Sequence, residues 1–215
     1  MTAVAITKKL SQRVLEVVDA GLSSGLGNRK PGEMCIEAAI CYALDLPHGD
    51  KPPCVGTAVR AFKIKLNDAA WPSNKARTSG MRRLAIAQLG SDTIDQNTFR
   101  TIVAVETVRQ IIAKLCREVL RRDDLARACE AATDSGSAYK AAMAVKAAAR
   151  AADAAAAYAA DAAASAAARA ADAAADAAAY AAARLQYLLL AAKIGEQALI
   201  ECNSPGCKYL SLCEE

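Results

Sequence analysis

The chain has 215 residues, of which 54% are hydrophobic and only 4% aromatic, and its formal net charge is +4. This length suits one domain or two small ones, and the shortage of aromatic side chains argues against a large aromatic core. The basic excess is too small to require a nucleic-acid partner. There is no secretion signal and no uncharged apolar run of about 18 residues, so we expect a cytoplasmic protein without a membrane span.

Four short helices are predicted in the first 90 residues. In the first of them, Leu10, Val14, Val17 and Val18 follow the three- and four-residue spacing of an amphipathic helix. Glycine and proline separate this segment from the next, and Pro47 begins a proline-rich loop. We expect helices within residues 7–22, 33–46, 56–71 and 79–90.

A long amphipathic helix is predicted within residues 91–134. Its apolar positions from Ile102 to Leu120 keep to one side at helical spacing, although several of these residues are β-branched. A strand would need alternation with a period of two, and that alternation is missing. The segment 133–137, "TDSGS", combines capping residues with a glycine and is the best candidate for a boundary.

Alanine dominates the next segment, which contains neither glycine nor proline between Ser137 and Ile194. Alanine has the highest helix propensity, so the sequence predicts one unbroken helix here. Several of its other residues recur every eleven positions, as Arg150, Asp161 and Asp172 do, which favours a narrow polar stripe on an otherwise smooth surface. Such a surface suits close packing against another helix or a second copy of the chain.

The predicted fold is therefore all-α, with an N-terminal bundle of short helices and two long helices packed as a bundle or an antiparallel hairpin. A C-terminal tail holds Cys202, Cys207 and Cys213 around a Ser-Pro-Gly turn and is expected to fold back as a cap. With no export signal, free thiols are favoured over disulfides. The predicted segments are 1–90, 91–134, 135–201 and 202–215.

Residues 32–54 carry the most recognisable site chemistry. Cys35, Glu37, His48 and Asp50 are the candidate binding residues in this segment. A Cys35–His48 catalytic pair is disfavoured, because a helix from Cys35 to Leu46 would separate them by about 16 Å. The structural alternative is a loop held by His48 and Asp50, and the metal alternative is a zinc site. Its ligands would be Cys41, His48, Asp50 and Cys54.

Three patterns in the N-terminal part carry a resemblance. They are "GEMCIEAA" at 32–39, "LPHGDKPPCV" at 46–55 and "LND" at 66–68. Together they resemble a module of uncharacterised bacterial and phage proteins, over roughly residues 30–90. The resemblance implies a shared fold and a bacterial or phage origin, and it implies no reaction.

A basic segment lies within the second half of that module. It offers Arg60, Lys63, Arg82 and Arg83 for phosphate contacts and Trp71 for stacking on a base. Nucleic-acid binding is therefore an alternative, although amphipathic surface helices have the same composition.

The sequence favours a non-enzymatic binding or interaction protein without catalytic residues. Its expected partner is a protein or a small ligand, and its long helices would form a homo-oligomer. A phage- or bacteria-encoded accessory or counter-defence role fits the resemblance. No cofactor is expected, with zinc as the alternative.

Overall fold

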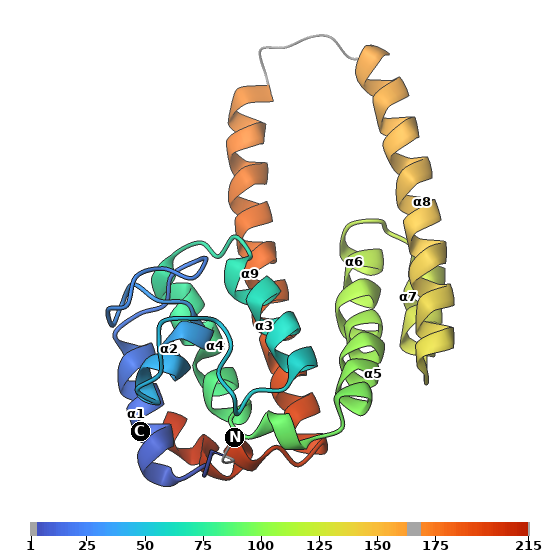
Figure 1. Ribbon diagram of the computed structural model, residues 1–215. Coiled ribbons are helices and arrows are strands. Elements are labelled where there is room, and N and C mark those ends of the chain that lie inside the picture. The colour runs from blue at the N-terminus through green and yellow to red at the C-terminus, as the bar shows by residue number, and fades with distance from the viewer. Residues whose placement is uncertain (1–3, 163–168, 215) are drawn as a thin grey trace. The chain divides into compact units, whose positions relative to one another are not determined.

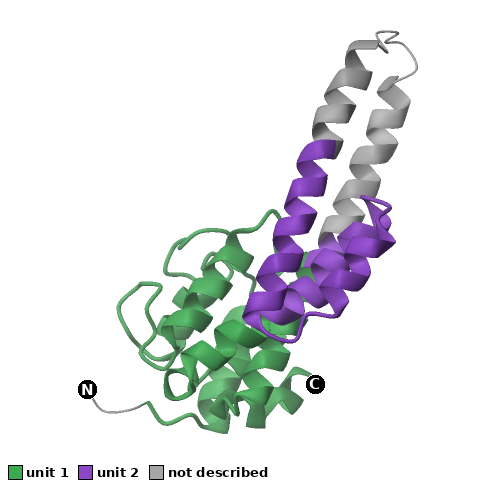
Figure 2. Ribbon diagram, turned by 90° about the vertical axis from the view of Figure 1, so that its right-hand side faces the viewer, with its two compact units in different colours: residues 1–103, 188–215 green, residues 104–187 purple. Residues whose placement is uncertain are grey.

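The computed structural model describes residues 4–162 and 169–214, with the side chains of residues 152–184 left out of the description. Within these residues the chain is all-α, as the sequence predicts, with helices and two isolated β-bridges but no strand. It divides into two compact units, Met1–Val103 with Leu188–Glu215 and Ala104–Tyr187 (Figure 2). The predicted segment boundaries differ, because the C-terminal part of the chain belongs to the same unit as the N-terminal part.

The first unit begins with helices α1 (Lys8–Asp19) and α2 (Ile36–Ala43) (Figure 1). The Thr7 hydroxyl caps α1 by accepting a hydrogen bond from the Leu10 amide at 3.2 Å. In the apolar stripe of α1, Val14 and Val18 are fully buried, and Leu10 at its start is half-buried. The loop between α1 and α2 turns back at Gly27, where φ is +69° and a β-carbon would lie 1.9 Å from the Glu33 carbonyl oxygen.

Helices α3 (Thr57–Asp68) and α4 (Asn74–Ala87) complete the predicted set of four. Helix α4 starts five residues earlier than expected, because Ser73 caps it by accepting from the Ala76 amide at 3.1 Å. The indole of Trp71 is buried against Gly80, and its Nε1–H donates to the Leu66 carbonyl at 2.8 Å. This pair fixes the turn that joins the two helices.

The C-terminal part of α9 (Arg169–Glu201) also belongs to the first unit. Gly195 of this helix lies against Phe62, whose ring would be 2.4 Å from a β-carbon at position 195. Phe62 in turn meets Phe99 edge to face, with their ring centroids 6.1 Å apart. The two phenylalanines of the chain therefore form one small aromatic contact, consistent with a core made mainly of aliphatic side chains.

The C-terminal tail folds back onto α4, as the sequence suggests. It forms a 3-10 helix, η3 (Pro205–Cys213), after a turn at Ser204. The Ser204 hydroxyl donates to the Ala87 carbonyl at 2.7 Å, and the Gly206 amide donates to the Leu89 carbonyl at 2.7 Å. The Arg82 guanidinium adds a 2.6 Å hydrogen bond to the Cys213 carbonyl.

The prediction of one long helix within 91–134 is wrong. A short 3-10 helix, η1 (Ser91–Thr93), precedes α5 (Gln96–Glu106), which continues through the π-helical turn η2 (Thr107–Ile112) into α6 (Ala113–Glu118). The chain then turns, with Arg121 in the left-handed region at φ +55°, and forms α7 (Asp123–Glu130). Two basic side chains stabilise this turn, since Arg122 pairs with Asp124 and Arg117 makes two 2.6 Å bonds to Glu130.

The second unit has a small apolar core of its own. Side chains from α6 and α7 meet the first turns of α8 (Ser135–Ala162) in this core. Its fully buried members are Cys116, Ala126 and Cys129. Small residues at these positions allow the helix backbones to approach closely.

The predicted alanine-rich helix corresponds to α8 and α9. The predicted unbroken helix would include residues 163–168, which lie outside the described residues. The eleven-residue stripe falls mainly on side chains 152–184, which also lie outside the description. Along the described parts of the chain, we find no helix with the length and apolar character to cross a membrane.

Candidate functional site

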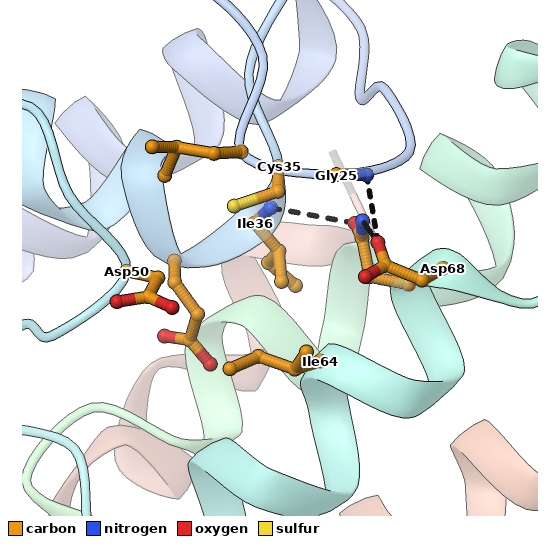
Figure 3. Close-up of a pocket in the computed structure, with 9 residues that line it drawn as sticks. Gly25, Cys35, Ile36, Asp50, Ile64 and Asp68 are labelled. Carbon is orange, nitrogen blue, oxygen red and sulfur yellow. Dashed lines mark hydrogen bonds between the residues drawn. The ribbon is translucent and has the colours of Figure 1, made fainter.

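A cavity of about 70 Å³ lies between the start of α2 and the second half of α3. Figure 3 shows Asp50 at one end of this pocket and Gly25 with Asp68 at the other, with Cys35, Ile36 and Ile64 between them. The remaining lining residues are Leu26, Glu37 and Asn67. The pocket therefore collects residues from all three patterns of the sequence module and from the loop between α1 and α2.

Asn67 and Asp68 hold the pocket walls together. The Asn67 side-chain oxygen accepts from the Ile36 amide at 3.4 Å, and its nitrogen donates to the Ser23 carbonyl and to Asp68 at 2.9 Å. The Asp68 carboxylate also accepts from the Gly25 amide at 2.7 Å. Ile36 begins α2, so Asn67 satisfies an amide that has no partner within the helix.

A buried ion pair lies beside the pocket. The Lys63 ammonium nitrogen is 2.9 Å from Glu37 Oε1, and both side chains are completely inaccessible to solvent. The two groups are close, but they are not aligned for a hydrogen bond, and neither Glu37 oxygen nor the Lys63 nitrogen has a hydrogen-bond partner within the described residues. Buried charges normally have such partners, so this pair is under-satisfied.

Burial also changes the protonation chemistry of the pair. Loss of solvent raises the pKa of Glu37 and lowers the pKa of Lys63, and their mutual attraction opposes both changes. The neighbouring Asp50 carboxylate raises the pKa of Glu37 further. Glu37 is thus a buried acid, and a second carboxylate that acts on it, Asp50, lines the same small cavity.

Cys35 lines the pocket as a helix cap rather than as a nucleophile. Its sulfur accepts a hydrogen bond from the Ala38 amide at 3.4 Å, which makes Cys35 the N-cap of α2. Burial raises the pKa of the Cys35 thiol despite its position at the helix start. The thiol form therefore prevails at neutral pH, and the arrangement does not activate Cys35.

The four predicted metal ligands are not brought together. Cys41 and Cys54 are buried, and burial raises the pKa of each thiol to about 11. His48 Nε2 instead lies 2.9 Å from the Gly27 carbonyl oxygen, so this histidine fixes the loop between α1 and α2. No group of three or more His, Cys, Asp or Glu side chains in the described parts of the chain is arranged to hold a metal ion.

Most of the candidate residues in the basic segment are buried or form ion pairs within the first unit. The expected surface positions of Lys63 and Trp71 are wrong, because both side chains are buried. Arg82 pairs with Asp19 at 2.7 Å, and Arg83 pairs with Glu196 at 2.8 Å. Arg60, Arg82 and Arg83 are all half-buried, and of these three Arg60 alone has no ion pair among the described residues. Helical periodicity did not reveal that acidic partners lie far away in the sequence.

Three larger hollows lie open on the first unit. Their volumes are about 300, 450 and 380 Å³, and they are lined around Arg13, Asp19 and Arg83 respectively. Each of these three residues is in an ion pair. Within the described residues, none of these hollows is lined by a buried polar side chain that lacks a hydrogen bond, whereas the small pocket has Glu37. The small pocket is therefore the better candidate site.

Sequence reasoning missed part of this pocket. It selected Cys35, Glu37 and Asp50, which the fold does bring together, but it omitted Asn67 and Asp68 from the binding residues. The signal for these two was the "LND" pattern at 66–68, where two consecutive polar residues end an amphipathic helix. One of them, Asn67, is buried, which the helical pattern alone did not predict.

The cysteines should react in two groups. All eight are free; Cys35, Cys41, Cys54, Cys116 and Cys129 are at most 5% exposed, and Cys202, Cys207 and Cys213 are half-buried. We expect iodoacetamide at neutral pH to modify the three C-terminal cysteines first, as measured by peptide mass spectrometry. All eight should react once urea unfolds the chain. Labelling of Cys35 as fast as Cys202 in the native protein would contradict the capped, buried thiol.

Comparison with protein-family models, curated proteins and solved structures yields no match for this chain.

Proposed function

We propose that the protein is a non-enzymatic binding protein whose first unit takes up a small ligand in the pocket beside Glu37. The observation that carries this proposal is a fully buried carboxylate, with no hydrogen bond to either oxygen, lining a cavity. A buried polar atom without a partner costs free energy, and a ligand that supplies the missing hydrogen bonds recovers it.

The chemistry of the pocket favours binding over catalysis. Catalysis by Cys35 would need a thiolate, and burial raises the pKa of this thiol. Lys63 has its pKa lowered by burial, but it does not belong to the pocket lining and so does not reach a bound molecule. Among the described residues that line the pocket with Glu37 there is no histidine and no hydroxyl group.

Two backbone amides provide a direct test of binding. The Gly25 amide donates to Asp68 and the Ile36 amide donates to Asn67, and both residues line the pocket. A ligand in the cavity should therefore shift both signals in a ¹H–¹⁵N NMR spectrum. The measurement is a titration of the full chain with a panel of cationic, neutral and anionic compounds of three to six heavy atoms.

The expected result is a saturable shift of the Gly25 and Ile36 signals with at least one compound of the panel. The Gly136 amide, which donates to Asp134 in the second unit, is the control signal and should stay unchanged. If no compound moves the two pocket signals at millimolar concentration, the proposed function is wrong.

A further inference from the structure

Building on the proposed function, we infer that the pocket recognises a primary ammonium group on a short aliphatic chain. Three carboxylates line the cavity, from Glu37, Asp50 and Asp68, and none of the nine described lining residues carries a positive charge. Among the described residues, the ammonium group that pairs with this set is that of Lys63, which contacts Glu37 from outside the cavity lining.

The net charge of this group does not depend on where the proton of the buried pair resides. Three carboxylates and one ammonium sum to −2, and transfer of a proton from Lys63 to Glu37 leaves the same sum. The carboxylates line the cavity and no cation does, so the charges nearest to a ligand are negative, whichever state the pair adopts. Two arginines outside the lining offset part of this negative charge, since Arg60 acts on Glu37 and Arg77 acts on Asp68.

The size and walls of the cavity limit the cation. A cavity of about 70 Å³ has room for roughly five water-sized groups. Leu26, Ile36 and Ile64 supply apolar surface next to the carboxylates. A nitrogen with a chain of three or four carbons fits this volume and presents its apolar part to these side chains.

The hydrogen-bonding groups select a primary ammonium over other cations. Glu37 Oε1 lies 2.9 Å from the Lys63 ammonium, but neither Glu37 oxygen accepts an aligned hydrogen bond, and Asp50 supplies a second carboxylate. These carboxylate oxygens are the acceptors for the three N–H donors of an ammonium head. A quaternary ammonium has no N–H group and so donates no such hydrogen bond. A metal ion would need three converging ligands, and the described side chains form no such group.

The test compares butylammonium with its neutral and anionic analogues, 1-butanol and butyrate, and with tetramethylammonium. Binding is followed through the Gly25 and Ile36 amide signals of the full chain. We expect butylammonium to bind at least about tenfold more tightly than 1-butanol, because hydrogen bonds to charged groups are stronger than neutral ones. Butyrate and tetramethylammonium should bind more weakly still.

Two variants test whether the Asp50 carboxylate contributes to butylammonium binding. Asp50→Asn should weaken butylammonium binding about tenfold and leave 1-butanol binding within twofold. Asp45→Asn is the matched control: it removes the same charge from an exposed residue paired with Arg13, and asparagine tolerates the left-handed backbone there. It should change butylammonium binding less than twofold.

The outcomes separate this inference from the proposed function. Equal or tighter binding of 1-butanol or butyrate would overturn the ammonium inference while the pocket remained a binding site. No shift with any of the compounds would overturn both. A further comparison with Nα-acetyl-lysine methylamide identifies the source of the ammonium. Binding as tight as that of butylammonium points to a lysine side chain of a partner protein, and binding of butylammonium alone points to a free amine.

Discussion

Replacing Lys63 with methionine should lower the free energy of unfolding by about 3–5 kcal/mol, the range for a buried pair that loses one partner. Methionine is close to lysine in length and apolar, so it fills the same space without a charge. Glu37 would remain completely buried without its cation, and none of its oxygens has another hydrogen bond in the described structure. Urea unfolding measures the difference.

The pH dependence of the free energy of unfolding tests whether the unpaired Glu37 charge causes the loss of stability in Lys63→Met. Burial already raises the pKa of Glu37 in the folded protein, and loss of the ammonium removes the main influence that lowers it. The folded variant would then hold Glu37 protonated, whereas the unfolded chain has an ordinary glutamate pKa of about 4.3. Stability tied to a raised pKa is fully present below the unfolded value and declines as pH rises. The loss in free energy of unfolding caused by Lys63→Met should therefore become smaller as the pH is lowered from 7 to 4.5.

Two control variants make the Lys63 result interpretable. Lys65 is on the same helix but exposed, so Lys65→Met should change the free energy of unfolding by less than about 0.5 kcal/mol. The double variant Glu37→Gln with Lys63→Met removes both charges and should recover much of the lost stability, because no isolated charge remains. A cost for Lys63→Met no larger than that of Lys65→Met would show that the buried pair does not hold the two helices together.

The same pair shows where sequence reasoning succeeds and where it stops. Lys63 lies on an amphipathic helix among other basic residues, and its sequence context is that of a surface lysine. Its burial depends on Glu37, which is 26 positions earlier and on another helix. Spacing along one helix predicts that helix, as it did for α1 to α4, but it does not report which face of a second helix will meet it.

Local backbone geometry explains the other main error. The apolar spacing from Ile102 to Leu120 continues with little interruption, and helical periodicity therefore predicted one long helix. The actual turn depends on Arg121 adopting a left-handed conformation, which a non-glycine residue rarely does. No glycine or proline marks the position. Ion pairs made after the turn, such as Arg117 with Glu130, stabilise it, and they involve residues thirteen positions apart.

The candidate pocket was predicted in part because its residues fall within short, chemically distinctive patterns. Cys35, Glu37 and Asp50 are close enough in sequence to be considered together, and the loop with three prolines limits where Asp50 can lie. His48 was included for the same reason, but its ring contacts the Gly27 carbonyl instead. The position of a loop side chain depends on the segments that pack against the loop, and these were not evident from the pattern.

The second large effect concerns the C-terminal tail, where Gly206→Ala should destabilise the first unit by about 3 kcal/mol or more. A β-carbon at this position would lie 2.0 Å from the Ile86 carbonyl oxygen and 2.9 Å from that of Leu89. These atoms belong to the backbone at the end of α4, so they cannot rotate away as a side chain could. The Gly206 amide also donates to Leu89, and this bond would be lost if the tail shifted.

Gly49→Ala is the matched control for this prediction. Gly49 is in a loop, its φ is not in the left-handed region, and a β-carbon there would meet only the Pro47 carbonyl oxygen at 4.0 Å. This variant should keep the stability of the original chain within about 0.5 kcal/mol.

Thermal unfolding followed by circular dichroism compares the two variants. If Gly206→Ala unfolds at the same temperature as Gly49→Ala, then the tail is not an integral part of the first unit. If it unfolds well below that temperature, the last residues of the chain are required to hold α4 and, through Arg82, the end of α1 in place.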